Sequence, residues 1–545
     1  MNILGYFALG WGTLLVGYKA LKPSVESIIK PDDRKTAAVL YNDGSDFVPT
    51  DRPVLFGHHW MSIAGTSPIV ASIVGLAWGW LPAFLWMVLG VIFIGGVHDF
   101  FVTMISSRNK GLSMGELLQK KIGPYSGKMS SIMLAFGGIL VFAIFLSVIA
   151  GTLAATPTAV IPTIALIGIA LVCGVLLKNG QPLVAVSAVG FGLTVVAVLI
   201  GLRFPIAMPQ LFWIWFFAAY TLAAIYLPVW VLLQPRDYVN SFVLIIGLAL
   251  GIVGILIARP SIQFPAFVGF VDAANRPLWP MLFATISCGA ASGWHSLIAA
   301  GTTSKQLKSE KDGFFISFFG MQSETIMALL SSALIITTVG YADFGAIASN
   351  AGAAFSAGLG TAVSYIGFPE VVGATIGALA LSALTLTTLD SFARTGRYVV
   401  QELGKGTPLE KPLPSALFIT AGGLILYFAV PFMALWSGLV LAGLIALIFP
   451  LVIIYAERVR TGQPLDKAHI FHVIIPLVFV YATSYAALSY QLMTFVRAFN
   501  WIAVSMIIFL MVMGFVIGME TYVSLKKPLS RLDAVQNSEL DMDAT

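Results

Sequence analysis

The sequence predicts an all-α polytopic membrane protein whose central helices form an inverted five-plus-five repeat. Of the 545 residues, 58% are hydrophobic and 10% are charged, whereas a soluble domain has roughly 25% charged residues. Apolar runs of about 20 residues, the length that crosses a bilayer, recur at short intervals along the chain. One of these runs, residues 54–76, also contains two adjacent histidines and several residues that break helices. Together these features predict a multi-pass transporter embedded in a lipid bilayer.

Fifteen segments are long and apolar enough to be predicted as spans. They are residues 3–21, 54–76, 82–106, 129–151, 158–177, 182–202, 211–232, 239–258, 280–300, 314–338, 370–389, 413–431, 434–456, 471–490 and 499–523. The first lacks a basic start and a small-residue cleavage site, so we expect a retained helix rather than a signal peptide. Residues 343–368, rich in Ala and Gly, are expected to be external or re-entrant.

The basic residues set the orientation, because cytoplasmic loops of membrane proteins are enriched in Lys and Arg. With the N-terminus outside and fifteen crossings, only Arg203, Arg259, Arg276 and Arg497 of the 30 Lys and Arg residues fall outside. A further span over residues 343–368 would reverse the direction of every later span. The last ten Lys and Arg residues assigned to the inside would then lie outside. We therefore expect a cytoplasmic C-terminus, and we interpret the net charge of +5 as a topology signal rather than a sign of nucleic-acid binding.

The predicted spans divide the chain into five parts. These are a first helix with a polar cytoplasmic linker (1–53), a first five-helix repeat (54–202), a second five-helix repeat (203–389), about four C-terminal helices (390–525) and a polar tail (526–545). Both cysteines lie within apolar runs, so no disulfide framework is predicted.

The segment 54–76 is predicted to be a discontinuous helix. Gly57, Gly65 and Pro68 weaken it, and a break within lipid frees backbone groups that must be satisfied. In transporters, such groups commonly line a solute cavity. The predicted substrate-binding residues of this segment are His58, His59, Gly65 and Ser67.

The two groups of five helices run in opposite directions, because five is odd. The second group begins with a span that contains Pro228, which would correspond to Pro68 by symmetry. The alternative is that Pro is simply commoner in membrane helices than in soluble ones. Pro228 and the nearby Gln234 complete this part of the predicted substrate site.

The predicted ninth helix, residues 280–300, has a polar stripe. Cys288, Ser292 and Ser296 repeat every four residues, with His295 beside them. We expect Ser292 to bind substrate and Ser296 and His295 to serve the coupling ion. Serine hydroxyls with freed carbonyls suit Na⁺, whereas a histidine suits H⁺. Serines bonded back to their own helix are the alternative.

Three carboxylates lie within or at the ends of the predicted spans, where charge is costly and so typical of function. Asp99 and Glu324 lie well inside their spans, and Asp390 lies at the inner end of another. All three are predicted coupling residues. For Asp99 and Asp390 an Asp–His or Asp–Arg pair that fastens helix ends is an equal alternative.

The sequence lacks a Walker-A loop, a Rossmann glycine motif and an H-E-x-x-H motif. Adjacent histidines also diverge too much to share one metal ion. We therefore expect secondary transport, with no enzymatic activity, no metal and no cofactor beyond H⁺ or Na⁺ as the coupling ion. Two alternatives stay open. One is a metal-dependent intramembrane enzyme that uses His58, His59, His295 and Glu324, and the other is a nutrient sensor that docks a partner on residues 22–53.

Several strings between residues 50 and 400 together resemble the carbon starvation protein A (CstA) family of inner-membrane transporters. They are Phe56-Gly57-His58-His59 with Ala64-Gly65, Gly96 to Phe100, Ser106 to Arg108 with Gly111, Leu233 to Tyr238, Cys288 to Thr303, and Thr388 to Tyr398. His98 stands where many members have Gln, and Trp294 where Phe is usual.

The resemblance implies uptake of peptides or pyruvate across the inner membrane during carbon starvation, driven by an ion gradient. It also implies an APC/LeuT-like five-plus-five fold. H⁺ is the expected coupling ion. The sequence leaves open the choice between peptide and pyruvate, between H⁺ and Na⁺, and the oligomeric state.

Overall fold

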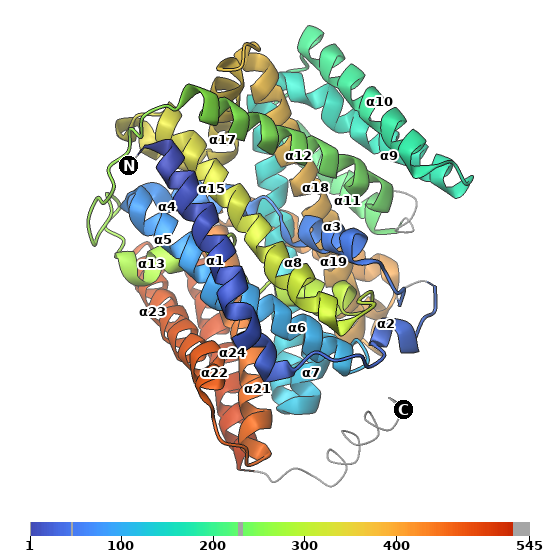
Figure 1. The fold of residues 1–545 in the computed structure, drawn as a ribbon, viewed down its shortest axis with the longest axis vertical. Coiled ribbons are helices and arrows are strands. Elements are labelled where there is room, and N and C mark those ends of the chain that lie inside the picture. The colour runs from blue at the N-terminus through green and yellow to red at the C-terminus, as the bar shows by residue number, and fades with distance from the viewer. Residues whose placement is uncertain (1, 45–46, 227–232, 527–545) are drawn as a thin grey trace.

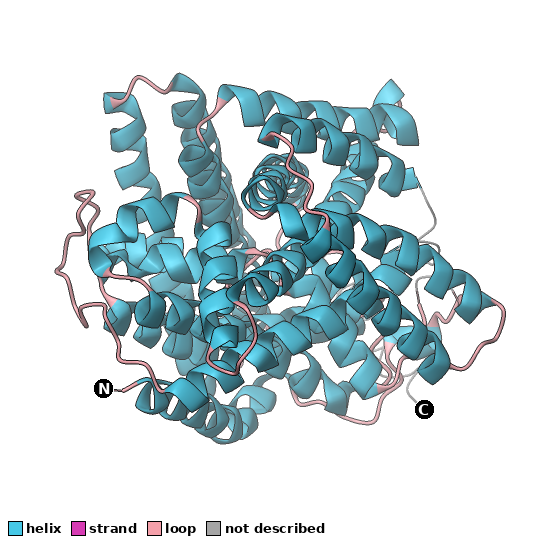
Figure 2. Cartoon of the chain, turned by 90° about the horizontal axis from the view of Figure 1, so that it is seen from above, coloured by secondary structure: helices cyan, strands magenta, loops and turns pink. Residues whose placement is uncertain are grey.

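The structure is a computed structural model that describes residues 2–44, 47–226 and 233–526. Within these ranges the chain folds into helices and loops, and no strand is formed (Figure 2). The predicted class, an all-α membrane protein with many spans, is confirmed. The division into repeats at residues 54–202 and 203–389 stays a prediction.

The α-helices are α1 (Ile3–Ile29), α2 (Ala37–Leu40), α3 (Arg52–Ile63), α4 (Ser67–Gly75), α5 (Trp80–Gly90), α6 (Gly96–Arg108), α7 (Met114–Lys121), α8 (Pro124–Ala155), α9 (Val160–Lys178), α10 (Leu183–Arg203), α11 (Gln210–Tyr226), α12 (Leu233–Ala258), α13 (Leu278–Thr285), α14 (His295–Ile298), α15 (Gly320–Thr338), α16 (Phe344–Ser349), α17 (Ala351–Ser364), α18 (Glu370–Leu403), α19 (Pro412–Ala429), α20 (Phe432–Ala446), α21 (Ile448–Arg460), α22 (Lys467–His469), α23 (Ile475–Arg497) and α24 (Trp501–Leu525). Short 3₁₀ segments are η1 (Leu76–Trp78), η3 (Pro157–Ala159), η5 (Glu310–Asp312), η7 (Tyr341–Asp343) and η8 (Pro408–Glu410). Four segments are π-helical: η2 (Val91–Gly95), η4 (Ala299–Thr303), η6 (Phe315–Phe319) and η9 (Ile470–Ile474).

Ten continuous helical segments of the described chain are long and apolar enough to cross a bilayer, and one bent pair would make eleven. The pair consists of Arg52–Ile63 and Ser67–Trp78, which meet at 53°. The predicted break within residues 54–76 is therefore confirmed. The predicted spans 211–232 and 239–258 correspond to shorter apolar helices, Gln210–Ile225 and Phe242–Ala258.

The structure corrects the prediction for residues 280–300. This segment is not a continuous helix, because α13 ends at Thr285 and α14 begins only at His295. The span predicted for 370–389 lies within α18, which continues without interruption to Leu403. Residues 343–368 form the short helices α16 and α17, and the 14 residues of α17 are fewer than the roughly 20 that a crossing needs.

Two long helices, α8 and α18, pack against each other through the middle of the bundle (Figure 1). Their backbones come close where Gly138 meets Gly396, since a Cβ at Gly138 would lie 3.3 Å from the Gly396 Cα. Small residues at a membrane helix interface allow this close approach. The pair forms one wall of the candidate site described below.

The polar linker after α1 is fastened to the loop that joins the π-helix η4 to η6. Glu310 of this loop is buried, and its carboxylate accepts hydrogen bonds from Arg108 Nε (2.8 Å) and Nη2 (2.6 Å) and from the Asp32 backbone N–H (3.2 Å). The backbone N–H of Thr50 donates to the Gln306 carbonyl at 3.0 Å. The linker therefore covers the end of the bundle that the basic residues assign to the cytoplasm.

Candidate transport site

The first interruption of the bundle lies between α3 and α4, at residues 64–66. Pro68 sits in the first turn of α4, where its missing N–H breaks no helical hydrogen bond. Gly65 lies against α18 so closely that an added Cβ would approach Thr388 Oγ1 to 2.8 Å. Thr66 Oγ1 is 3.1 Å from Thr385 Oγ1 of the same helix. The long helix α18 thus holds the break in place.

The second interruption is the irregular loop 286–294 between α13 and α14. Gly289 has φ +85°, a left-handed conformation that glycine adopts without strain. Side chains from neighbouring helices satisfy the freed carbonyls, because Trp86 Nε1 donates to Ile286 O (2.9 Å) and Thr325 Oγ1 donates to Gly289 O (2.8 Å). Irregular backbone within a membrane requires such partners. The loop is therefore stabilised by tertiary hydrogen bonds.

The two interruptions meet at a small cavity. Four of the residues predicted from the sequence line it together: Gly65, Ser67, Ser292 and His295. The remaining lining residues are Ser62, Ile63, Val141, Phe145, Ser287, Cys288, Trp294, Ile298, Thr388, Phe392, Leu439 and Val440. Among the described residues that line the cavity, none is Lys, Arg, Asp or Glu.

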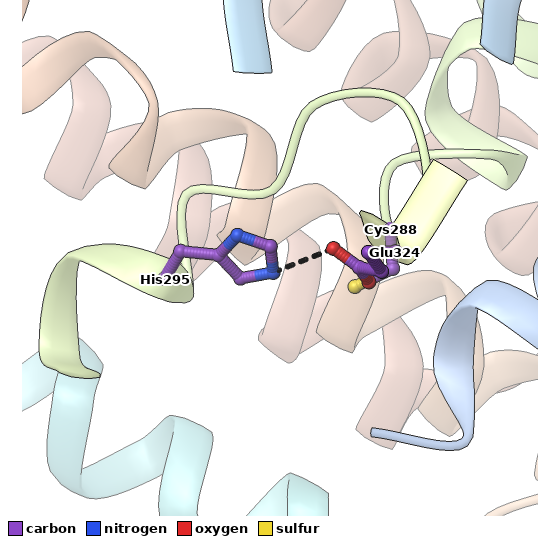
Figure 3. Close-up of side chains that lie close together, drawn as sticks. All are labelled: Cys288, His295 and Glu324. Atoms are coloured by element: carbon purple, nitrogen blue, oxygen red, sulfur yellow. Dashed lines mark ion pairs between the residues drawn. The ribbon is translucent and has the colours of Figure 1, made fainter. Parts of the chain in front are cut away.

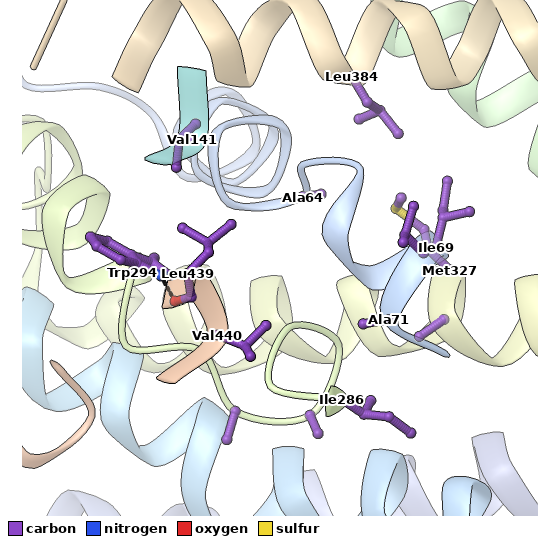
Figure 4. Packing of buried hydrophobic residues seen from close by; sticks show 14 of the residues in the cluster. Ala64, Ile69, Ala71, Val141, Ile286, Trp294, Met327, Leu384, Leu439 and Val440 are labelled. Atoms are coloured by element: carbon purple, nitrogen blue, oxygen red, sulfur yellow. Dashed lines mark hydrogen bonds between the residues drawn. The ribbon is translucent and has the colours of Figure 1, made fainter. Parts of the chain in front are cut away.

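Trp294 lines the cavity and lies next to Leu439, another lining residue (Figure 4). The Trp294 Nε1 donates to the Leu439 carbonyl at 2.9 Å, which joins the loop to α20. Gly137 and Gly443 make room for the ring, since a Cβ at either position would run into it. The Trp294 ring is therefore accommodated by two glycines on separate helices.

A chain of buried ion pairs adjoins the cavity, with Asp99 at its centre. Asp99 Oδ2 lies 2.9 Å from His295 Nδ1, and Asp99 Oδ1 lies 2.9 Å from His98 Nδ1. A third histidine, His59, has its Nε2 4.0 Å from Asp99 Oδ2 and its Nδ1 2.8 Å from Thr303 Oγ1. His59 and Asp99 are fully buried. Thus α3, α6 and α14 are joined at one carboxylate.

Glu324 extends this chain from α15. Its Oε2 lies 3.3 Å from His295 Nε2, and its side chain is fully buried (Figure 3). His295 therefore stands between two carboxylates, with one ring nitrogen facing each. Cys288 lies beside Glu324, and its thiol donates to Ser292 Oγ at 3.2 Å.

Three of the four π-helical segments adjoin this chain. The segment η2 ends three residues before His98, η4 contains Thr303, and η6 ends five residues before Glu324. A π-turn inserts an extra residue into a helix and rotates the side chains that follow, and such turns are frequent at functional sites. Wide turns therefore lie close in sequence to His98, Thr303 and Glu324.

The other residues predicted for the site lie elsewhere or have local partners. Ser296 Oγ donates to the Gly293 carbonyl at 2.6 Å, so it bonds back to its own segment. Asp390 pairs with Arg236 of α12, away from the histidines. His58 is half-buried on α3, and Gln234 lies in the first turn of α12. Pro228 lies outside the described residues.

Sequence reasoning missed three residues that the structure brings to the site. Thr388 lines the cavity, Thr303 contacts His59, and Cys288 lies near Glu324. Cys288 belongs to the polar stripe in which Cys288, Ser292 and Ser296 recur every four residues. This pattern is the signal that could have identified it. Neither Thr388 nor Thr303 differs in pattern from the many other Thr residues of apolar helices.

Sequence comparison relates the chain to one protein family. The family described as carbon starvation protein CstA matches residues 7–354. A Mycobacterium tuberculosis protein named peptide transporter CstA is 35% identical over 345 residues, 59% of this chain and 45% of that protein. An Escherichia coli protein named pyruvate/proton symporter BtsT is 38% identical over 336 residues, 57% of this chain and 46% of its own length. The matched part is thus about half the length of these curated relatives.

A solved structure of an Eremococcus coleocola manganese transporter aligns with a TM-score of 0.47 at 10% identity, covering 88% of this chain and 99% of that one.

Proposed function

The chain belongs to the carbon starvation protein CstA family, and on this basis we propose that it is a secondary transporter that takes up small carboxylate-bearing nutrients, either peptides or pyruvate. One observation supports this most directly: two interrupted segments from distant parts of the sequence enclose a single cavity. Interrupted membrane helices persist where a solute uses their freed backbone groups. The protein resides in the inner membrane, with its N-terminus outside and its C-terminus in the cytoplasm.

The start of α4 is the candidate binding point for a carboxylate. The N-terminal N–H groups of a helix have no partner within it, and they favour anions. The N-cap residue Thr66 makes no side-chain hydrogen bond to this turn, and Ser67, the first residue of α4, lines the cavity. Ser292 adds a hydroxyl from the opposite loop. Gly65 lets the chain pass close to α18 and keeps the space open.

The buried ion-pair chain is the candidate coupling site. It is built from Asp99, His295, Glu324 and His59, and its member His295 also lines the cavity. A site that shares a residue with the cavity can link ion and solute occupancy. H⁺ is the coupling ion we propose, and the name pyruvate/proton symporter given to the relative BtsT supports this choice.

Uptake by proteoliposomes tests the proposal directly. Purified protein would be reconstituted and supplied with labelled pyruvate or labelled dipeptides, with an imposed pH gradient, an imposed Na⁺ gradient or neither. We expect one solute class to accumulate only with the pH gradient. Accumulation with Na⁺ alone would change the coupling ion, and no accumulation of either class under any gradient would contradict the proposed function.

We expect Ser292→Ala to raise the KM for uptake roughly two- to tenfold, because a neutral hydrogen bond contributes about 0.5–1.5 kcal/mol. Ser484→Ala is the matched control. Its hydroxyl is also buried but donates to the Val480 carbonyl of its own helix, far along the chain from the cavity. KM and Vmax of both variants would be measured at equal protein content. Equal KM values for the two variants would show that Ser292 does not contact the solute.

A further inference from the structure

Cys288, His295 and Glu324 bring three different metal-ligating atoms to one place (Figure 3). The Cys288 Sγ, a ring nitrogen of His295 and a carboxylate oxygen of Glu324 all lie within 4.8 Å of one another. They come from both ends of the irregular loop and from α15, so tertiary structure assembles the group. None of the three is adjacent in sequence to another.

One pair in this group has the spacing of two ligands on one metal ion. His295 Nε2 and Glu324 Oε2 are 3.3 Å apart. Two ligands at metal distances of about 2.0–2.2 Å in a tetrahedral site are roughly 3.4 Å apart. The two atoms therefore need almost no movement to share an ion.

The Nδ1 atom of His295 has the kind of hydrogen-bond partner that metal-binding histidines usually have. This atom faces the Asp99 carboxylate at 2.9 Å, and a carboxylate accepts, so Nδ1 is the donor. This leaves Nε2 directed at Glu324. A metal-ligating histidine almost always donates its other N–H to a carboxylate or carbonyl, which fixes the ring. Asp99 is fixed in turn by His98, at 2.9 Å.

Glu324 brings a fully buried carboxylate to the group. Its Oε2 pairs with His295 Nε2, although neither carboxylate oxygen accepts a hydrogen bond of good geometry from the described residues. Buried charges in proteins are normally paired or bound to metal ions. The 3.3 Å contact with His295 Nε2 is the contact that orients Glu324 towards the group.

We propose that Cys288, His295 and Glu324 bind one divalent transition-metal ion of the Zn²⁺ type, in which case the coupling proton of the proposed function is left to Asp99 and His59. Thiolate, imidazole and carboxylate together suit a metal of intermediate softness, and Mg²⁺ or Ca²⁺ would require more oxygen ligands. Cys288 and His295 also line the cavity, so an ion that they hold would border it. The ion would place a positive charge beside a cavity whose described lining has neither Lys nor Arg.

Metal binding can be measured on the purified full chain without any transport assay, so its outcome is separate from that of the proposed function. The protein would be purified through a histidine-free tag, stripped with a chelator and titrated with Zn²⁺, followed by elemental analysis. We expect one Zn²⁺ per chain. With Co²⁺ in place of Zn²⁺, we expect a near-ultraviolet thiolate-to-cobalt charge-transfer band.

Cys288→Ser and Glu324→Gln are expected to weaken Zn²⁺ binding by at least about 100-fold. Substituting a residue that only hydrogen-bonds a metal ligand costs roughly 10–100-fold in affinity, and loss of a ligand itself should cost more. Cys173→Ser is the matched control, because Cys173 is buried in α9 and takes no part in the group. It is expected to bind Zn²⁺ as the unmodified chain does. Size-exclusion profiles and helical circular dichroism would verify that each variant is folded.

Two results would overturn the metal site. The first is a folded, unmodified protein that binds no stoichiometric Zn²⁺. The second is a thiolate-to-cobalt band that persists in Cys288→Ser or disappears in Cys173→Ser. If Cys288→Ser does not fold, loss of binding in folded Glu324→Gln with retention in Cys173→Ser supports the site, and unchanged binding in Glu324→Gln overturns it.

Discussion

Asp99→Asn is expected to abolish gradient-driven accumulation of solute while the protein remains folded. The substitution keeps the size of the side chain but removes the charge that joins His295, His98 and His59. Truncating one partner of a buried charged pair costs about 2–5 kcal/mol. Since 1.4 kcal/mol is tenfold in an equilibrium constant, we expect accumulation to fall by more than about tenfold.

Measuring both net uptake and solute exchange distinguishes a role of Asp99 in ion coupling from a role in structure. Exchange of labelled for unlabelled solute, with equal ion concentrations on both sides, needs the cavity but not the gradient. We expect Asp99→Asn to retain exchange and to lose accumulation. Asp343→Asn, at an exposed carboxylate in η7, is the control and should retain both. Loss of exchange and accumulation in equal measure would place Asp99 in a structural role instead.

Removal of either charge of the Arg236–Asp390 pair is expected to cause the largest loss of stability. Both side chains are buried, and Arg236 Nη1 donates to Asp390 Oδ2 and, at 2.6 Å, to Tyr220 Oη. Breaking a buried pair leaves an uncompensated charge, at a cost of about 3–5 kcal/mol. Arg236→Ala and Asp390→Ala should therefore both lower the Tm in detergent strongly.

Two further variants separate charge from packing at this pair. The double variant Arg236→Met with Asp390→Leu should recover much of the lost Tm, because replacing both charges leaves none unpaired. Tyr220→Phe should cost only about 1 kcal/mol, the usual value of one hydrogen bond. Single charge variants with Tm values equal to that of Tyr220→Phe would show that the pair does not fasten α12 to α18.

Much of the membrane architecture was predictable, because it depends on local features of the sequence. Apolar length is enough to locate spans, and the predicted spans near 82–106, 314–338 and 434–456 match Trp80–Arg108, Glu310–Thr338 and Ala434–Arg460. The break near Gly65 was predictable for the same reason, since glycine and Pro68 weaken a helix wherever they occur. These properties require no knowledge of distant residues.

The break at 286–294 was not predictable, because tertiary contacts decide it. The string contains Gly289 and Gly293, but glycines spaced four residues apart are equally typical of closely packed membrane helices. No proline lies between Pro280 and His295 to mark an end. The irregular loop forms because the side chains of Trp86 and Thr325 take up its carbonyls, and neither contact is visible in the segment itself.

The candidate site was predicted as a set of residues but not as an arrangement. His59, Asp99, His295 and Glu324 were identified because ionisable groups are rare within spans. Their partners depend on how far each helix is rotated. The same limit explains Asp390, whose carboxylate pairs with Arg236 of a helix far away in the sequence.

The most direct test of the two-break cavity is the labelling of Cys288 by a maleimide in a Cys173→Ser background. Cys288 lines the cavity and is the only other cysteine of the chain. A solute that the protein transports is expected to slow this labelling in proportion to its occupancy of the site. Labelling of the folded protein at the same rate with and without a saturating transported solute would contradict the cavity as the place where solute binds.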